Sequence, residues 1–166
     1  MKMKENKELP KGWKWVKLKE IAEVKGGKRL PKGAEYEDGK TEFPYIRVTD
    51  FENNTINQNN LKYLNSKVQN AIKNYTISSE DLYISIAGTI GKVGLVPINL
   101  CGANLTENAA KITQIKNINL KYLLCLLNSE TVQKQIQKQT IATTQPKLAL
   151  YKIENLDLIL PPIGIQ

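Results

Sequence analysis

Short runs of apolar residues, broken by polar turns, make up most of the chain. The runs "LYISIAG" (82–88) and "GKVGLVP" (91–97) have the length and the apolar, β-branched content of strands. A third run from Ala109 to Ile115 and a fourth from Leu156 to Leu160 have the same character. We therefore expect these four segments to form strands.

The segment "PYIRVTDF" differs from these runs because its apolar and polar residues alternate. Alternation has the two-residue period of a strand, whose side chains point to opposite faces in turn. One face then carries Tyr45, Arg47 and Thr49, and the other carries Ile46 and Val48. The pattern predicts a further strand here.

One segment, "INLKYLLCLLNSETVQKQIQKQ", has a strong helical period. An apolar stripe runs along its first half, at Leu120, Leu123, Leu124 and Leu127. Ser129, followed by Glu130, is a good N-cap for a second and more polar helix. We expect two consecutive helices with one buried stripe.

Shorter helices are predicted at Leu18–Ala22, Ser66–Asn74 and Ala149–Ile153. In the first of them the helical spacing of apolar residues includes Trp15. Long polar stretches at 26–43 and 53–60 predict loops. Regular alternation of strands and helices is absent, so we expect the α+β class: a curved, mostly antiparallel sheet of short strands, several short helices and long polar loops.

The stretch "SIAGTIGKVG" contains three glycines and one lysine directly after a predicted strand, which raises the question of a phosphate loop. A P-loop needs a glycine five residues before the Gly-Lys pair and a Ser or Thr after it, but Ile86 and Val93 occupy these positions. The GxGxxG spacing of dinucleotide sites is absent too. We expect a tight turn between two strands, whose glycines adopt positive φ or allow close approach of another backbone. Lys92 in this turn remains a candidate phosphate contact.

The net charge of +8 indicates a polyanionic partner, although a lysine-rich composition alone would produce the same value. The chain contains no histidine, which excludes mechanisms that need imidazole as a base or as a metal ligand. Glu107 and Lys111 lack the spacing of a nuclease motif. We therefore expect no catalysis by this chain, no cofactor and no metal.

Cys101 and Cys125 are too few for a disulfide framework or a zinc site, and we expect them to be small apolar core residues. No apolar run approaches the length of a membrane span, and residues 1–19 lack the apolar centre of a secretion signal. We therefore expect a cytoplasmic protein without a membrane partner.

Two polar loops have side chains suited to DNA. The loop "GGKRLPKG" can place cations on phosphates, and its arginine can take a guanine edge. The loop "TIATTQPKL" offers hydroxyls for phosphates and a glutamine for an adenine edge. The full set of candidate DNA contacts is Lys25, Lys28, Arg29, Lys32, Arg47, Lys92, Thr143, Thr144, Gln145 and Lys147. The alternative for each is a solvated surface residue, and for Arg47 an ion pair with an acidic neighbour.

These motifs, in this order along the chain, resemble one family. The segments "LPKGWKWVKLKEIAEVKGGKRLPKG", "FPYIRVTDF", "YISIAGTIGKVGLVP", "ANLTENAAKI", "LKYLLCLLNS" and "TTQPKLALYKIENLDLILPP" look like one target recognition domain of the specificity subunit of type I restriction-modification systems. The resemblance covers nearly the whole chain. It implies a single recognition domain over residues 1–166, with residues 161–166 where the family's spacer region starts.

The resemblance implies a sequence-specific module for double-stranded DNA that reads one half of a two-part target site. In the family, spacer helices dock methyltransferase (M) subunits that hold S-adenosylmethionine, a restriction (R) subunit uses ATP, and the specificity subunit is not a catalyst. A second recognition domain or self-association would supply the other half of the site.

Two departures from the family pattern concern the end of the chain and one loop. The chain reads Ile165 and Gln166 where the family usually continues through a Glu-Gln pair, and Ala142 and Thr143 replace a glycine before "TQP". A second hypothesis from another class stays open beside the resemblance: a protein-interaction or scaffold relative whose basic surface binds an acidic partner or a sister subunit. An exposed apolar patch along Leu120–Leu127, together with the absence of a continuous basic cleft, would favour it.

Overall fold

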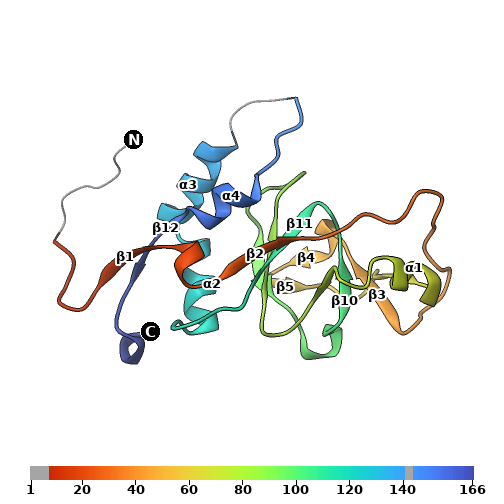
Figure 1. Cartoon of the computed structure of the whole chain (residues 1–166), viewed down its shortest axis with the longest axis horizontal. Helices are drawn as coiled ribbons and strands as arrows, with labels where there is room; N and C mark the ends of the chain where they lie inside the picture. The colour runs from red at the N-terminus through yellow and green to blue at the C-terminus, as the bar shows by residue number, and fades with distance from the viewer. Residues whose placement is uncertain (1–7, 141–143) are drawn as a thin grey trace.

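The computed structural model describes residues 8–140 and 144–166, whose strands form two four-stranded sheets and two strand pairs (Figure 1). The first sheet has the order β2 (Glu23–Gly26), β11 (Ala109–Thr113), β8 (Leu82–Ser85) and β9 (Val93–Leu95). The second has the order β6 (Lys62–Leu64), β3 (Phe43–Ile46), β10 (Ala103–Leu105) and β7 (Thr76–Ile77). The pairs are β1 (Lys14–Lys17) with β12 (Asp157–Leu160), and β4 (Phe51–Glu52) with β5 (Thr55–Ile56).

The helices are α1 (Ser66–Ala71), α2 (Leu120–Asn128), α3 (Glu130–Gln139) and α4 (Leu150–Glu154). Three of them, α2, α3 and α4, lie beside the β1–β12 pair at one end of the elongated molecule, and α1 lies beside β3 at the other end (Figure 1). None of the helices in the described ranges combines the length and apolar character needed to cross a bilayer.

The predicted break between α2 and α3 is confirmed. The Ser129 hydroxyl accepts the Val132 N–H at 3.4 Å, which caps α3 as the sequence indicates. In the apolar stripe of α2, Leu123 and Leu127 are fully buried, and Leu120 and Leu124 are partly buried against the same core. This core fills the space between the helices and the first sheet.

A second core lies on the opposite face of the first sheet. It contains Tyr83 and Ala109 from that sheet, together with Ile46, Ile77 and Leu105 from the second sheet. Because both faces of β8 are covered, all four of its residues are buried. This explains why Leu82, Tyr83 and Ile84 follow one another without the alternating polar residues of a strand that has one exposed face.

The expected α+β class is confirmed, and antiparallel pairing dominates as predicted. The exception among the described strands is β3 with β10, which are parallel, with Tyr45 opposite Asn104. The strands form two four-stranded sheets instead of one, and the second core is packed between these two sheets.

The helix predicted at Leu18–Ala22 is a single 3₁₀ turn over Leu18–Glu20. Trp15, assigned to its apolar stripe, lies instead in β1, with Ile159 of β12 opposite it. The β1–β12 pair joins segments from the two ends of the chain, and such pairing leaves no local signal in the sequence.

The strand predicted for "PYIRVTDF" ends at Ile46 and is followed by a 3₁₀ turn over Val48–Asp50. The Asp50 carboxylate accepts the Arg47 backbone N–H at 2.8 Å, so it caps this turn and stops the strand. The alternating pattern was therefore only partly realised.

The expectation that the cysteines are core residues was wrong, because both are exposed. Cys101 follows a surface 3₁₀ turn, where its sulfur accepts the Ser79 N–H at 3.2 Å. Cys125 lies on the outer face of α2, away from the stripe that holds Leu123 and Leu127.

Candidate nucleic-acid interface

Four loop segments come together at one end of the first sheet, and we call them the loop surface: residues 27–32, 86–89, 106–108 and 144–147. Main-chain hydrogen bonds join them. The Lys28 N–H donates to the Leu105 carbonyl at 2.9 Å, the Ile86 N–H to the Asn108 carbonyl at 2.8 Å, and the Leu148 N–H to the Ile86 carbonyl at 2.8 Å. Figure 1 shows the turn after β8 beside the segment that leads into α4. Segments more than 100 residues apart in sequence therefore form one continuous surface.

Gly27 allows the basic segment 28–32 to lie against the turn at 106–108. A Cβ atom at this position would approach the Thr106 carbonyl oxygen to 2.0 Å and the Leu105 carbonyl oxygen to 2.4 Å. The missing side chain lets the Gly27 N–H reach the Ala109 carbonyl at 3.0 Å. The position of the neighbouring cations therefore depends on a glycine.

The cations of segment 28–32 and of β2 are exposed to solvent. The Arg29 side chain is 78% exposed, and its Nε lies 3.7 Å from Oε1 of Glu107. The Lys28 ammonium lies 5.5 Å from the centre of the Tyr75 ring. Lys32 is free to reach outward, and Lys25 has an exposed ion pair with Glu23 at 3.4 Å. The structure thus places Lys28, Arg29 and Lys32 together, with Lys25 further along the edge strand.

Arg47 lines the same cleft as Arg29, a hollow of about 480 Å³, and these two are the arginines of the chain. Its Nη2 lies 2.9 Å from Oδ1 of Asp50, and its Nε lies 3.3 Å from Oδ2. Nη2 also donates to the Asn60 carbonyl at 2.9 Å. The alternative of an acidic neighbour is therefore realised, and the guanidinium is largely engaged inside the protein.

Tyr45 holds the main chain of the loop surface at Lys28 through a hydrogen bond. Its hydroxyl donates to the Lys28 carbonyl at 2.9 Å, and burial raises its pKa to about 12. The phenol therefore stays protonated, and able to donate, well above neutral pH.

This raised pKa predicts a loss of stability in alkali. A group whose folded pKa lies above its unfolded value of 10.0 stabilises the fold fully below pH 10, and that contribution falls as the pH rises toward 12. We expect the free energy of unfolding, measured in urea at pH 9 and above, to fall less steeply for Tyr45→Phe than for the wild-type chain. Parallel curves for the two proteins would contradict this account.

The second basic loop lies beside the turn after β8. Lys147 forms a bridge with Ala87, and Thr144, Gln145 and Lys147 are exposed. Thr143, which the sequence also indicates, lies outside the described residues. The loop contributes an amide and a cation to the loop surface.

The glycine turn is confirmed as a connection between two antiparallel strands, β8 and β9. Gly91 has a φ of 89°, and a Cβ atom on Gly94 would approach the main-chain carbonyl carbon of Asn54 to 2.6 Å and the Tyr83 hydroxyl oxygen to 2.1 Å. The Lys92 ammonium donates to the Phe51 carbonyl at 3.3 Å, beside the β4–β5 hairpin, and Lys92 is not among the residues that line the Arg29 cleft. Both uses of glycine that the sequence predicts are present.

The predicted DNA contacts omit several polar residues that line the cleft, among them Glu107 and Tyr36. Tyr36 packs against Tyr45 with ring centres 5.6 Å apart, and its side chain is partly exposed. The signal for Glu107 was its place in "LTENAA", directly before a predicted strand. No local pattern connects this carboxylate to the basic loops, because its place beside them depends on the fold.

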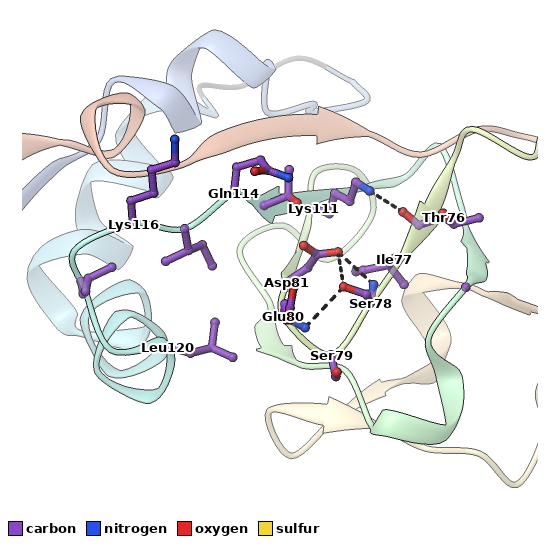
Figure 2. A pocket seen from close by; sticks show the side chains of 14 residues that line it. Thr76, Ile77, Ser78, Ser79, Glu80, Asp81, Lys111, Gln114, Lys116 and Leu120 are labelled. Atoms are coloured by element: carbon purple, nitrogen blue, oxygen red, sulfur yellow. Dashed lines mark hydrogen bonds between the residues drawn. The ribbon is translucent and has the colours of Figure 1, made fainter.

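A larger cavity, of about 680 Å³, lies at the opposite end of the first sheet (Figure 2). There the Asp81 carboxylate accepts the Ser78 N–H at 2.9 Å, and the Lys111 ammonium donates to the Thr76 carbonyl at 2.7 Å. Its ionisable side chains are of both signs, two acids and two lysines, and none of the candidate DNA contacts lines it. This cavity is therefore poorly suited to a polyanion.

Solved structures share the fold of the whole molecule. A chain of a type I restriction-modification system aligns over 98% of this chain and 37% of its own length, with a TM-score of 0.75 and 16% identity. The HsdS subunit from Thermoanaerobacter tengcongensis aligns over 98% of this chain and 37% of its own length, with a TM-score of 0.68 and 18% identity. The described fold therefore occurs within these larger chains, over about a third of their length.

The sequence places the chain in a family. Residues 10–166 match the family described as the type I restriction modification DNA specificity domain, and the chain belongs to this family. It is 24% identical over 131 residues to the EcoBI specificity subunit of Escherichia coli, covering 78% of this chain and 27% of that subunit. It is 25% identical over 165 residues to the MjaVIII specificity subunit of Methanocaldococcus jannaschii, covering 96% of this chain and 38% of that subunit. The chain thus spans about a third of the length of these relatives.

Proposed function

We propose that this chain reads DNA sequence through the loop surface and recognises one half of a two-part target site. The observation that carries the proposal is the convergence of Arg29, Gln145 and Lys147, from distant parts of the chain, on one exposed surface beside a cleft. Cations on such a surface hold phosphates, while arginine and glutamine have the paired donors and acceptors that base edges need. Family membership supports the same reading.

In this proposal the chain itself catalyses nothing. It directs methyltransferase and restriction subunits to DNA in the cytoplasm, and a second recognition domain or a second copy of the chain reads the other half of the site. The relatives named as specificity subunits of type I restriction enzymes support this assignment. The scaffold alternative is weaker, because the apolar stripe on which it depends is largely buried against the first core.

Binding of the chain to a random-sequence duplex should fall steeply with salt. Four cations of the loop surface, Lys28, Arg29, Lys32 and Lys147, can each neutralise one phosphate, which predicts a slope of about −3 to −4 in a plot of log K against log salt. Affinity should then drop about 100-fold between 50 and 200 mM salt. Fluorescence anisotropy with a labelled duplex measures both values.

Two triple variants, each of which removes three positive charges from a different part of the surface, test the proposed location. The variant Lys28→Ala/Arg29→Ala/Lys32→Ala should flatten the slope by about 2 to 3. The control Lys14→Ala/Lys116→Ala/Lys121→Ala removes the same charge from exposed sites outside the loop surface, and should leave the slope nearly unchanged. Equal effects of the two variants, or no binding by the wild-type chain at 50 mM salt, would refute the proposed surface.

A further inference from the structure

Glu107 places a negative charge in the middle of the surface proposed for DNA. It is the acidic residue among those that line the 480 Å³ cleft, which also holds Arg29 and Arg47. Its side chain is 32% exposed. A carboxylate beside a phosphate would weaken binding, so a carboxylate here must face a different part of the DNA.

Glu107 has three polar neighbours within the protein: the Thr106 hydroxyl, the Tyr45 phenol and the Arg29 guanidinium. The Thr106 hydroxyl donates to Oε2 at 3.0 Å, and this hydrogen bond helps to orient the carboxylate. The ion pair of Oε1 with Arg29 spans 3.7 Å, beyond a good hydrogen bond, and the arginine is exposed. Such pairs add little to stability, so a structural role alone does not explain an acid at this position. The carboxylate therefore lines the cleft with part of its surface open to a ligand.

The chemistry of base edges selects the partner. In the major groove, a carboxylate suits the N4 amino group of cytosine, whereas the N6 amino group of adenine lies beside the N7 acceptor, which repels the carboxylate. On the same base pair, guanine presents the O6 and N7 acceptors that arginine takes through two hydrogen bonds. Arg29 and Glu107 thus have the donor and acceptor groups that complement the two halves of one C·G pair.

We infer that Glu107 is a specificity-determining residue that accepts a hydrogen bond from the N4 amino group of a cytosine, beside a guanine read by Arg29. The inference rests on the proposed function, because it needs DNA at the loop surface. It goes further by assigning a base type to one position of the target and by giving an acidic residue a direct role in recognition.

Selection of bound sequences from a random duplex pool tests the inference. The wild-type chain should enrich a motif that contains one strongly preferred C·G pair. Glu107→Gln keeps the size of the side chain but adds a donor and removes the charge, so preference at that one pair should fall at least about fivefold. The other positions should keep their preference, and affinity for random DNA should rise as the negative charge is lost.

Two controls separate direct reading from other causes. Glu80→Gln makes the same change of charge in the cavity at the opposite end of the first sheet, and should leave the motif unchanged. Glu107→Gln should also alter the preference in an Arg29→Ala background. An unchanged motif for Glu107→Gln, or an effect that disappears without Arg29, would overturn direct reading by Glu107. If the wild-type chain enriches no motif at all, the proposed function itself fails.

Discussion

The Gly27→Ala variant is expected to lose about 3 kcal/mol of the free energy of unfolding. The added methyl group would lie 2.0 Å from the Thr106 carbonyl oxygen and 2.6 Å from its carbonyl carbon, so main chain, not a flexible side chain, must move. The hydrogen bonds from the N–H groups of Gly27 and Lys28 to the 105–109 segment would be strained by this movement. Urea unfolding followed by circular dichroism measures the loss.

Gly39→Ala is the matched control. This glycine lies in the same long loop, has no positive φ, and has open space where a Cβ would be added. Its substitution should change the free energy of unfolding by less than about 0.5 kcal/mol. Equal stabilities of the two variants would mean that segment 27–32 does not pack against the 105–107 main chain.

Gly27→Ala should also weaken DNA binding under conditions in which it stays folded. A shift of the main chain at Gly27 moves Lys28 and Arg29 away from Glu107 and the rest of the loop surface. We expect affinity for random duplex to fall at least tenfold, about 1.4 kcal/mol, below 100 mM salt. Gly39→Ala should bind as the wild-type chain does, because its position lies outside the loop surface.

The parts of the fold that the sequence predicted have local causes. The strands β8, β9, β11 and β12 and the helices α2 and α3 occur close to their expected positions, because each combines a clear apolar period with turn or capping residues at its ends. The α1 helix ends earlier than expected, at Ala71, since residues 72–75 turn back to bring β7 into the second sheet. The pairing of strands determines where such elements end, and local periodicity does not predict that pairing.

For the candidate site too, the sequence predicts the character of single residues but not which of them lie together. Residue types and loop character identified Lys28, Arg29, Lys32, Gln145 and Lys147 as exposed polar groups. The sequence does not predict that these residues lie close together. Their proximity depends on main-chain contacts of Ala87 and Asn108 with segments far along the chain. Proximity in three dimensions also connects Glu107 to the site.

Asp50→Ala is expected to cost about 2–3 kcal/mol of the free energy of unfolding, at the lower end for a broken buried ion pair. Asp50 is 3% exposed, and its carboxylate accepts three hydrogen bonds from Arg47, one from the backbone and two from the guanidinium. Its removal leaves a half-buried guanidinium held only by the Asn60 carbonyl, and a backbone N–H without its acceptor. Chemical denaturation of the purified variant measures the effect.

Asp157→Ala tests whether the loss of stability in Asp50→Ala comes from the burial of the ion pair or from its short N–O distance. The Lys17–Asp157 pair is shorter, at 2.7 Å against 2.9 Å for Arg47–Asp50, but its side chains are 40% and 51% exposed. An exposed pair contributes at most about 1 kcal/mol, because water screens the charges and solvates each partner after the other is removed. Asp157→Ala should therefore cost much less than Asp50→Ala despite its closer contact.

Equal losses for these two variants would show that the burial of Asp50 does not determine the size of the loss. Asp50→Asn refines the test, since an amide oxygen can still accept the Arg47 backbone N–H but no longer carries the charge. Its cost should lie between those of the wild-type chain and Asp50→Ala. DNA affinity tests whether Arg47 has a structural role alone. In that case Asp50→Asn should bind random duplex more tightly than the wild-type chain, because the guanidinium loses its internal partner and becomes available to phosphate.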